Sequence, residues 1–398
     1  MKKEKGKKVV VAMSGGVDSS VAAALLKQKG YQVIGLFMKL WAEGENRCCD
    51  IDSLESARRV AAELEIPFYV VDFKKEFKKY IVGNYLKEYS SCRTPNPCVL
   101  CNRIIKFDLL LAKAKSLGAD YLATGHYVRI ADGAKRPIGS SSLVRNVQFK
   151  QAKRLNNLNK RSDQTNLQLL QGVDSSKDQS YFLWTLMQKQ LEHLLFPISD
   201  YKKSEVRVMA KKWGLPVYNR QESQGLCFVG KQKASQFLKQ NVQARPGPIK
   251  DLKGNIIGKH TGLPFYTIGQ RTGLPELRSM NNELRIKGKT PPLYVIKLDK
   301  KNNALIVGEE KDLYKKELMV SDINWISGEP PVSKKIGARI RYGHPAIPCG
   351  VSNLKLKTKN EKLKIVFEKP VRAITPGQSI VFYRGNEVLG GGIIEIKK

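Results

Sequence analysis

Apolar residues in the N-terminal half of the chain fall into short runs that alternate with stretches of helical character. Runs rich in Val, Ile, Leu and Tyr predict buried strands at residues 9–12, 32–38, 67–72 and 121–127. The stretches between them have helix-forming composition and spacing, at residues 21–27, 53–64 and 108–117. Strands that alternate with helices are typical of a parallel sheet with crossover helices. We therefore expect an α/β domain with a parallel sheet over residues 1–232.

The second half of the chain has a different pattern, in which Gly and Pro separate short apolar runs. Turn residues recur every few positions from about residue 233 and predict a small β-rich central module over residues 233–300. Further apolar runs predict a compact antiparallel β-barrel over residues 301–398, at 304–307, 363–367, 379–383 and 393–396. Residues 131–168 are basic and poor in apolar side chains, so they predict a flexible insertion.

A loop at residues 13–20 joins the first predicted strand to a helical stretch, with the sequence Met-Ser-Gly-Gly-Val-Asp-Ser-Ser. Backbone N–H groups at the start of a helix bind anions, and glycines let the main chain approach a phosphate closely. The loop lacks the Lys of the common mononucleotide motif. It matches instead the loop of enzymes that split ATP into AMP and pyrophosphate and so adenylate an oxygen atom.

The expected ATP site extends from this loop to the ends of other strands. Ligands bind an open α/β sheet at the carboxyl ends of its strands, and Met38 and Gly125 fall at such ends. The expected ATP-binding residues are Ala12, Met13, Ser14, Gly15, Gly16, Val17, Asp18, Ser19, Met38 and Gly125. Mg²⁺ is expected with ATP, because the phosphates need charge neutralisation during adenylation.

The charge of the chain favours a polyanionic partner. With 70 Lys and Arg against 36 Asp and Glu, the formal net charge is +34, and basic residues recur along the whole chain. Nucleic acid is the partner that fits best, while solubility alone and an anionic membrane surface are the alternatives. No run of about 20 apolar residues predicts a membrane span, and the N-terminus lacks a signal-peptide pattern. We expect a cytoplasmic protein.

The cysteines carry a second kind of chemistry. Seven cysteines, an odd number at uneven spacing, do not form the pattern of a secreted disulfide framework. Cys98 and Cys101 stand three residues apart just before a helical stretch, where a helix N-terminus can activate a thiol, and Cys227 follows far downstream. Zinc sites, dithiol switches and iron–sulfur clusters all use a Cys-x-x-Cys pair, so the pair alone leaves its role open.

Five motifs occur together, in order, along most of the chain. They are the loop, Asn-Pro-Cys-x-x-Cys-Asn at 96–102, Ala-Thr-Gly-His-Tyr at 123–127, Lys-Asp-Gln-Ser-Tyr-Phe-Leu at 177–183 and Ser-Gln-Gly-Leu-Cys at 223–227. Each motif alone is weak, but their joint presence is specific, and the sequence closely resembles the tRNA-specific 2-thiouridylase family. The stretch at 260–273 and Arg341-Tyr342 extend the resemblance over nearly the whole chain.

The resemblance implies a tRNA sulfurtransferase with an adenine-nucleotide α-hydrolase-like N-terminal domain. Such an enzyme would adenylate the C2 oxygen of the wobble uridine with ATP and would then replace that oxygen with sulfur. Cys227 would carry the sulfur as a persulfide received from a sulfur-relay protein or a cysteine desulfurase. Cys101 would complete the transfer, either by forming a disulfide bond with Cys227 or by releasing bound sulfide.

The resemblance also implies residues that hold the RNA. Asn96, Pro97 and Cys98 would surround the target base, which must leave the anticodon stack for chemistry. The residues implied to contact tRNA are His126, Lys177, Asp178, Gln179, Arg341, Tyr342 and Gln378. The central module would add a further tRNA-binding surface.

Two features depart from the family's pattern. Cys98 stands where some relatives carry Asp, so Cys98, Cys101 and Cys227 could ligate a [4Fe-4S] cluster and support iron–sulfur-dependent thiolation. The insertion at residues 131–168 looks longer than is usual in the family. Another ATP-pyrophosphatase synthetase and an RNA-binding metal or redox protein are the remaining alternatives. The cysteines that match no functional position are Cys48, Cys49, Cys92 and Cys349.

Overall fold

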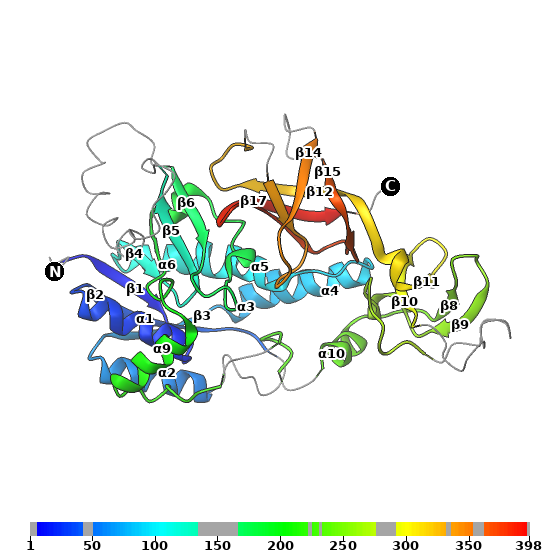
Figure 1. Cartoon of the computed structure of the whole chain (residues 1–398). Coiled ribbons are helices and arrows are strands. Elements are labelled where there is room, and N and C mark those ends of the chain that lie inside the picture. Colours follow the sequence, from blue (N-terminus) through cyan, green and yellow to red (C-terminus); the bar gives the residue numbers. More distant parts are fainter. Residues whose placement is uncertain are drawn as a thin grey trace.

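Three groups of strands follow one another along the chain in the structure, a computed structural model (Figure 1). The structure describes residues 6–42, 51–133, 166–221, 225–230, 233–275, 292–331, 336–352 and 362–395. Most of the basic insertion expected at 131–168 therefore lies outside the described residues, as do Cys48, Cys49, Ser223 and Gln224.

The N-terminal domain is built on a five-stranded parallel sheet with the order β3-β2-β1-β4-β7. Its strands are β1 (Lys8–Ala12), β2 (Gln32–Lys39), β3 (Phe68–Asp72), β4 (Tyr121–Ala123) and β7 (Leu194–Leu195). In β1, Val9 and Val11 pack into one apolar cluster and Val10 packs into another, and all three are fully buried. A strand that is buried on both faces reads as a continuous apolar run, as this one does in the sequence.

Helices cover both faces of the parallel sheet (Figure 1). One face packs against α1 (Val17–Gln28), α2 (Ile51–Glu63) and α9 (Lys203–Lys212). The other packs against a continuous helical run of α5 (Pro97–Cys101), the π-helical segment η2 (Asn102–Leu110) and α6 (Leu111–Ser116). A second run, α3 (Lys74–Phe77), η1 (Lys78–Val82) and α4 (Gly83–Ser90), packs against α5 and η2 in a separate apolar cluster.

The central module is a four-stranded sheet with the order β10-β11-β8-β9. Its elements are α10 (Ala234–Asn241), β8 (Gly247–Lys250), β9 (Ile256–His260), η5 (Leu263–Phe265), β10 (Tyr294–Asp299) and β11 (Ala304–Gly308). The run at 304–307, expected in the C-terminal barrel, instead forms β11 of this sheet. It lies there because β10 and β11 form an antiparallel hairpin and β11 also pairs with β8.

The C-terminal domain is a closed barrel of six strands, because β12 pairs with both β15 and β17. The elements are η7 (Glu310–Leu313), β12 (Tyr314–Trp325), β13 (Ile336–Arg339), β14 (Ile347–Ser352), β15 (Leu363–Arg372), β16 (Ser379–Arg384) and β17 (Glu387–Glu395). A hairpin of β5 (Val128–Asp132) and β6 (Leu167–Gln171) from the N-terminal domain pairs with β17. The barrel and the N-terminal domain therefore share one extended sheet.

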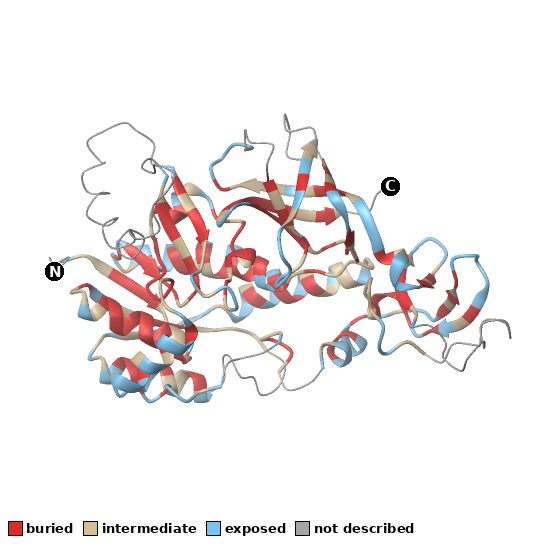
Figure 2. Cartoon of the chain, in the orientation of Figure 1, coloured by how far each residue is buried: buried red, intermediate tan, exposed pale blue. Residues whose placement is uncertain are grey.

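Buried residues are concentrated in the parallel sheet, the helices against it and the barrel (Figure 2). Two short helices, η4 (Ser180–Phe182) and α8 (Gln188–Leu191), connect β6 to β7. These observations confirm the predicted fold class, an α/β N-terminal domain followed by a β-rich module and a β-barrel. Among the described residues, no helix is long and apolar enough to cross a membrane.

Candidate active site

The loop between β1 and α1 is held in shape by the hydroxyl groups of its own serines. The backbone N–H of Ser14 donates to Ser19 Oγ at 3.2 Å, and the hydroxyls of Ser19 and Ser20 donate to Gly16 O at 3.1 and 2.9 Å. Gly16 caps α1 with an extended backbone, so the helix begins directly at the carboxyl end of β1. An anion bound at this loop meets free N–H groups and the positive end of a 12-residue helix.

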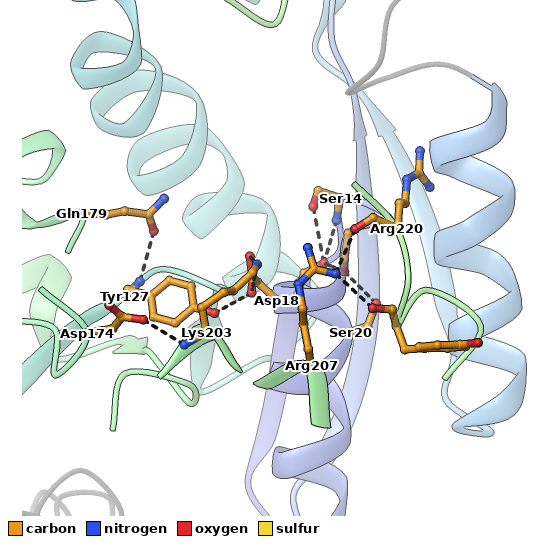
Figure 3. Close-up of polar contacts among 12 residues, drawn as sticks. Ser14, Asp18, Ser20, Tyr127, Asp174, Gln179, Lys203, Arg207 and Arg220 are labelled. Carbon is orange, nitrogen blue, oxygen red and sulfur yellow. Dashed lines mark hydrogen bonds and ion pairs between the residues drawn. The ribbon is translucent and has the colours of Figure 1, made fainter. Parts of the chain in front are cut away.

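A lysine from the distant helix α9 reaches this loop (Figure 3). Lys203 Nζ lies 2.7 and 2.6 Å from the two carboxylate oxygens of Asp18, and the Tyr127 hydroxyl donates to Asp18 at 2.7 Å. The Lys203 side chain is only 10% exposed, and its backbone N–H donates to Asp174 at 2.9 Å. The loop's own sequence lacks a lysine, but the fold supplies one from 185 residues away. Sequence reasoning missed Lys203 because no local pattern marks this contact.

An arginine that follows α9 braces the other side of the loop. Arg220 Nη1 donates to Gly15 O at 3.1 Å, and its Nη2 donates to Ser53 Oγ at 2.7 Å. Gly15 has a φ of +75°, and a Cβ atom at this position would overlap Ser53 O. Glycine is therefore required by both the backbone angle and the close approach of α2. The guanidinium group also adds positive charge beside the loop.

Two residues expected to line the adenine pocket lie at neighbouring strand ends. Gly125 follows β4, and a Cβ atom there would lie 2.8 Å from the backbone of Asp18 and Ser19. The end of β4 therefore packs directly on the loop. Met38 lies near the end of β2, next to β1 in the sheet, and its side chain is partly buried. The structure thus brings the predicted ATP-binding residues to one edge of the sheet.

Cys101 and Cys227 pack in the same apolar cluster although they are far apart in the sequence. Cys101 is the last residue of α5 and is 9% exposed, while Cys227 is partly exposed. The neighbouring Phe228 is buried against Phe77 and Tyr85, with ring centroids 6.1 and 5.1 Å away. These rings hold the segment of Cys227 against the helices that surround Cys101.

The residues expected around the target base form the first turn of α5. Asn96 caps this helix, and its side-chain oxygen accepts the backbone N–H of Val99 at 3.4 Å. Pro97 occupies the first helical position, where its missing N–H costs nothing. Cys98 is exposed, whereas Cys101, one turn later, is buried.

The three cysteines do not form a metal-ligand set. Cys98 is exposed, Cys101 is buried in the apolar cluster and Cys227 is partly exposed. Within the described part of the chain, no three His, Cys, Asp or Glu side chains come together in a way that could hold a metal ion. The residues present therefore do not fit a [4Fe-4S] cluster, and we derive no step through one.

Motifs from three parts of the chain meet beside α5. The Asn102 side chain donates to Phe182 O at 3.2 Å, and Phe182 packs against Tyr342 with ring centroids 4.6 Å apart. Tyr342 is 45% exposed, so its ring offers a surface on which a nucleobase can stack. The neighbouring Arg341 turns inward, and its Nη2 donates to Ile268 O at 3.1 Å. Arg341 thus links the barrel to the central module.

Some residues expected at the RNA surface hold the protein's own structure together. Asp178 is 4% exposed. The donors to its carboxylate are Gln171, Gly172, Ser180 and Arg339. The Gln179 side chain accepts the backbone N–H of Tyr127 at 3.1 Å, as Figure 3 shows, and Lys177 is partly exposed. His126 is 8% exposed and packs between Phe107 and Phe196.

The barrel grips the segment that leads into α5. The Gln378 side chain donates to Thr94 O at 2.8 Å and to Pro95 O at 3.2 Å, and Thr94 N–H donates to Pro376 O at 2.9 Å. A Cβ atom on Gly377 would lie 3.0 Å from the Thr94 backbone, so the segments around Gly377 and Thr94 are in close contact. The carbonyl groups just before Asn96 are therefore fixed by the C-terminal domain.

Arg93 forms a further contact between the two domains, an ion pair with Glu395. Its Nη1 and Nη2 lie 2.9 and 3.0 Å from the two carboxylate oxygens of Glu395, which is 302 residues away in the sequence. Arg93 Nε also donates to Glu88 at 2.7 Å. The Arg93 and Glu395 side chains are both 17% exposed. Paired, two-point hydrogen bonding of this kind fixes geometry as well as charge.

Family models match three successive parts of the chain. The model described as a tRNA methyl transferase HUP domain matches residues 7–231, which is more than half of the chain. The tRNA methyl transferase PRC-barrel domain matches residues 235–309, and the aminomethyltransferase beta-barrel domain matches residues 315–394.

Individual relatives agree with these matches. The chain is 43% identical to the tRNA-specific 2-thiouridylase MnmA of Halothermothrix orenii, over 98% of this chain and 99% of the relative. It is 42% identical to the protein of the same name from Clostridioides difficile, over 98% of each chain. The solved U34-tRNA thiolase NcsA from Methanococcus maripaludis is 21% identical over 56% of this chain and 61% of that chain, and its TM-score of 0.33 is too low to carry an argument. The chain belongs to the tRNA-specific 2-thiouridylase family.

Proposed function

We propose that this chain uses ATP to replace the C2 oxygen of the wobble uridine of tRNA with sulfur, releasing AMP and pyrophosphate. The observation that carries the proposal is that Cys101 and Cys227 share one apolar cluster in a member of this family. A synthetase that acts on a small carboxylate needs no such pair of thiols. The net charge of +34 suits a large polyanionic substrate, and we expect the reaction in the cytoplasm, where tRNA is found.

The first step is adenylation at the loop. The β- and γ-phosphates of ATP would bind at the N-terminus of α1, where Arg220 adds positive charge and the Lys203–Asp18 pair fixes the shape of the loop. The uridine O2 attacks the α-phosphorus, the bond from that phosphorus to the pyrophosphate oxygen breaks, and the N3 proton is released. Mg²⁺ would neutralise the phosphates. A carbonyl oxygen leaves poorly, whereas the O-adenylate formed here leaves as AMP.

The second step is sulfur transfer from a persulfide on Cys227, loaded by a sulfur-relay protein or a cysteine desulfurase. The terminal sulfur attacks C2 and loses its proton, the C2–O2 bond breaks, and AMP leaves. The Cys101 thiolate then attacks Cys227 Sγ. This breaks the S–S bond to the transferred sulfur and forms a Cys101–Cys227 disulfide. N3 of the base regains a proton, and 2-thiouridine is the product. The persulfide sulfur gains the two electrons that the two thiols lose. A thiol reductant resets the enzyme.

The target base would lie at the first turn of α5, against Asn96, Pro97 and Cys98. Asn96 also lines a cavity of about 150 Å³ between α5 and the barrel, whose lining does not include Pro97, Cys98 or Cys101. We assign Tyr342, an exposed ring beside α5, to base stacking. We assign Lys177 to the surrounding RNA surface. We assign Arg341 a positioning role, because it turns inward and donates to Ile268 O of the central module. The central module would hold the tRNA body.

Some residues expected to contact tRNA bind other parts of the protein instead, and these would affect tRNA binding indirectly. We assign Gln378 a positioning role, because it binds the carbonyl groups before Asn96. We assign Asp178 and Gln179 the role of fixing the segment that carries Phe182.

The test is nucleoside mass spectrometry on unmodified tRNA incubated with the protein, ATP, Mg²⁺ and a persulfide donor, with pyrophosphate release followed in parallel. Wild type should form 2-thiouridine only when ATP is present, and Cys101→Ser and Cys227→Ser should form none. Cys349→Ala is the matched control, because Cys349 is buried in the barrel away from the thiol cluster. AMP formation without thiolated uridine in wild type would mean that the substrate is a different one.

A further inference from the structure

Lys106, on the helical run that carries Cys101, extends its ammonium group to the residue after Gly125 at the end of β4. It lies on η2, five residues after Cys101, and its Nζ is 3.5 Å from His126 Nε2. His126 directly follows Gly125, whose backbone packs on Asp18 and Ser19. Lys106 is partly buried, and among the described residues its side-chain contact is with His126 rather than with a carboxylate. A partly buried ammonium group that faces no carboxylate is available to pair with a bound anion.

The protein holds this ammonium group through a neutral histidine. Burial, and then the charge of Lys106, lower the pKa of His126 well below its ordinary value, so the ring is uncharged near pH 7. His126 Nδ1 lies 2.7 Å from Thr124 Oγ1. The tautomer with its proton on Nδ1 donates to Thr124 and leaves Nε2 free to accept from Lys106. Thr124 is 3% exposed, and Phe107 and Phe196 fix the ring from the sides.

We propose that Lys106 is a catalytic residue that contacts the α-phosphoryl group of ATP, and that His126 and Thr124 are positioning residues for it. This proposal rests on the function proposed above. The loop and Arg220 serve the β- and γ-phosphates, while the α-phosphorus must meet uridine O2 on the side toward α5. Lys106 lies on that side. It takes part in no bond change, and it offsets the negative charge on the oxygens of the α-phosphoryl group during adenylation and when AMP leaves.

The variants that test this are Lys106→Met, which removes the charge, and Lys106→Arg, which keeps it. Pyrophosphate release is measured with saturating tRNA over a range of ATP concentrations. We expect Lys106→Met to lower kcat on the order of 10²-fold, the usual effect of losing one charged donor to a reacting group. Lys106→Arg should retain most of the rate. Lys113→Met, an exposed lysine on α6 of the same helical run, is the control and should match wild type.

Chemical rescue separates a catalytic role from a structural one. In Lys106→Ala, added propylammonium should restore part of the pyrophosphate release, because a free cation can occupy the vacated space, whereas it should not change the rate of wild type. His126→Gln keeps an acceptor for Lys106 and should lose less activity than His126→Phe. The double variant Lys106→Met with His126→Phe should be no slower than Lys106→Met alone, because the two residues act as one unit.

Two results would overturn the proposal while leaving the function intact. In the first, the wild-type protein thiolates tRNA, and Lys106→Met releases pyrophosphate at a rate within threefold of the wild-type rate. The second is an unchanged kcat with a weaker tRNA affinity and a salt dependence reduced by about one counterion, which would assign Lys106 to an RNA phosphate. Failure of wild type to thiolate tRNA would instead overturn the proposed function itself.

Discussion

Lys203 and Asp18 form an ion pair between the first turn of α9 and the loop after β1, with Nζ–oxygen distances of 2.7 and 2.6 Å. The pair places a lysine beside a phosphate-type loop that has none in its own sequence. It also joins the beginning and the end of the N-terminal domain, so the shape of the loop depends on the docking of α9.

Replacing Lys203 should therefore affect both stability and ATP chemistry. Lys203→Met keeps an unbranched side chain but leaves the Asp18 carboxylate with the Tyr127 hydroxyl as its remaining side-chain donor. We expect a loss of about 1–2 kcal/mol in the free energy of unfolding, less than for a fully buried pair because Asp18 is 31% exposed. Pyrophosphate release should fall on the order of 10²-fold. Urea unfolding and a pyrophosphate assay measure the two effects, with the exposed Lys211→Met on the same helix as control. Unchanged ATP chemistry in Lys203→Met would remove this residue from the site.

The glycines of the loop should differ sharply in what they tolerate. Gly15→Ala and Gly125→Ala each place a Cβ atom against backbone, and Gly15 also has a φ of +75°. Both variants should raise the KM for ATP more than tenfold, because the loop must move. Gly16→Ala is the matched control for stability, since its Cβ atom would meet only Ser14 Oγ at 3.5 Å within the protein. Urea unfolding and ATP titrations of the three variants provide the comparison, and an equal loss of stability in Gly15→Ala and Gly16→Ala would contradict the packing described here.

Arg93 should position α5 for tRNA through the barrel. Arg93→Met breaks the contact with Glu395 across 302 residues of sequence and should cost about 2 kcal/mol of stability. Because the segment before Asn96 loses part of its support, the KM for tRNA should rise, while ATP affinity should stay the same. Arg384→Met is the control, since its pair with Glu387 lies within one exposed hairpin. Steady-state kinetics with tRNA and with ATP separate the two effects. A change in the KM for ATP alone would argue against a positioning role at α5.

His126 should make the protein less stable in mild acid. The folded state holds its pKa below the ordinary value through burial and Lys106, so below about pH 6.5 the unfolded chain binds a proton that the folded chain does not. The free energy of unfolding is therefore highest above about pH 6.5 and decreases as the pH is lowered. At pH 5.5 the decrease is about 1 kcal/mol. Urea unfolding at pH 7.5 and 5.5 should show a smaller difference in His126→Phe than in wild type. An equal difference would mean that His126 is charged in the folded protein.

Much of the fold could be predicted from the sequence because its signals are local. The apolar runs of β1 and β2, the helical stretch of α1 and the Gly-Gly turn between strand and helix each lie within a few residues. The run at 304–307 was misplaced because an apolar run does not reveal its partner, and the β10–β11 hairpin decides that partner.

The site was predicted less completely, for two physical reasons. Lys203 and Arg220 were missed because their contacts with the loop depend on how α9 docks, and no spacing in the sequence records that docking. A motif also does not say which way a side chain turns. Asp178 and Tyr342 were both expected to face RNA, yet one is 4% and the other 45% exposed. The buried Asp178 supports the surface from inside, whereas the exposed Tyr342 is part of the surface itself.

The proposed function depends on sulfur delivery by Cys227 and completion of the transfer by Cys101. It is tested most directly by loading the protein with persulfide, allowing one turnover on unmodified tRNA without reductant, and analysing the digested protein by mass spectrometry. We expect a peptide pair linked through Cys101 and Cys227 in proportion to the 2-thiouridine formed, and no such pair when ATP is omitted. Formation of 2-thiouridine with both thiols still reduced, or with equal yield in Cys101→Ser, would contradict it.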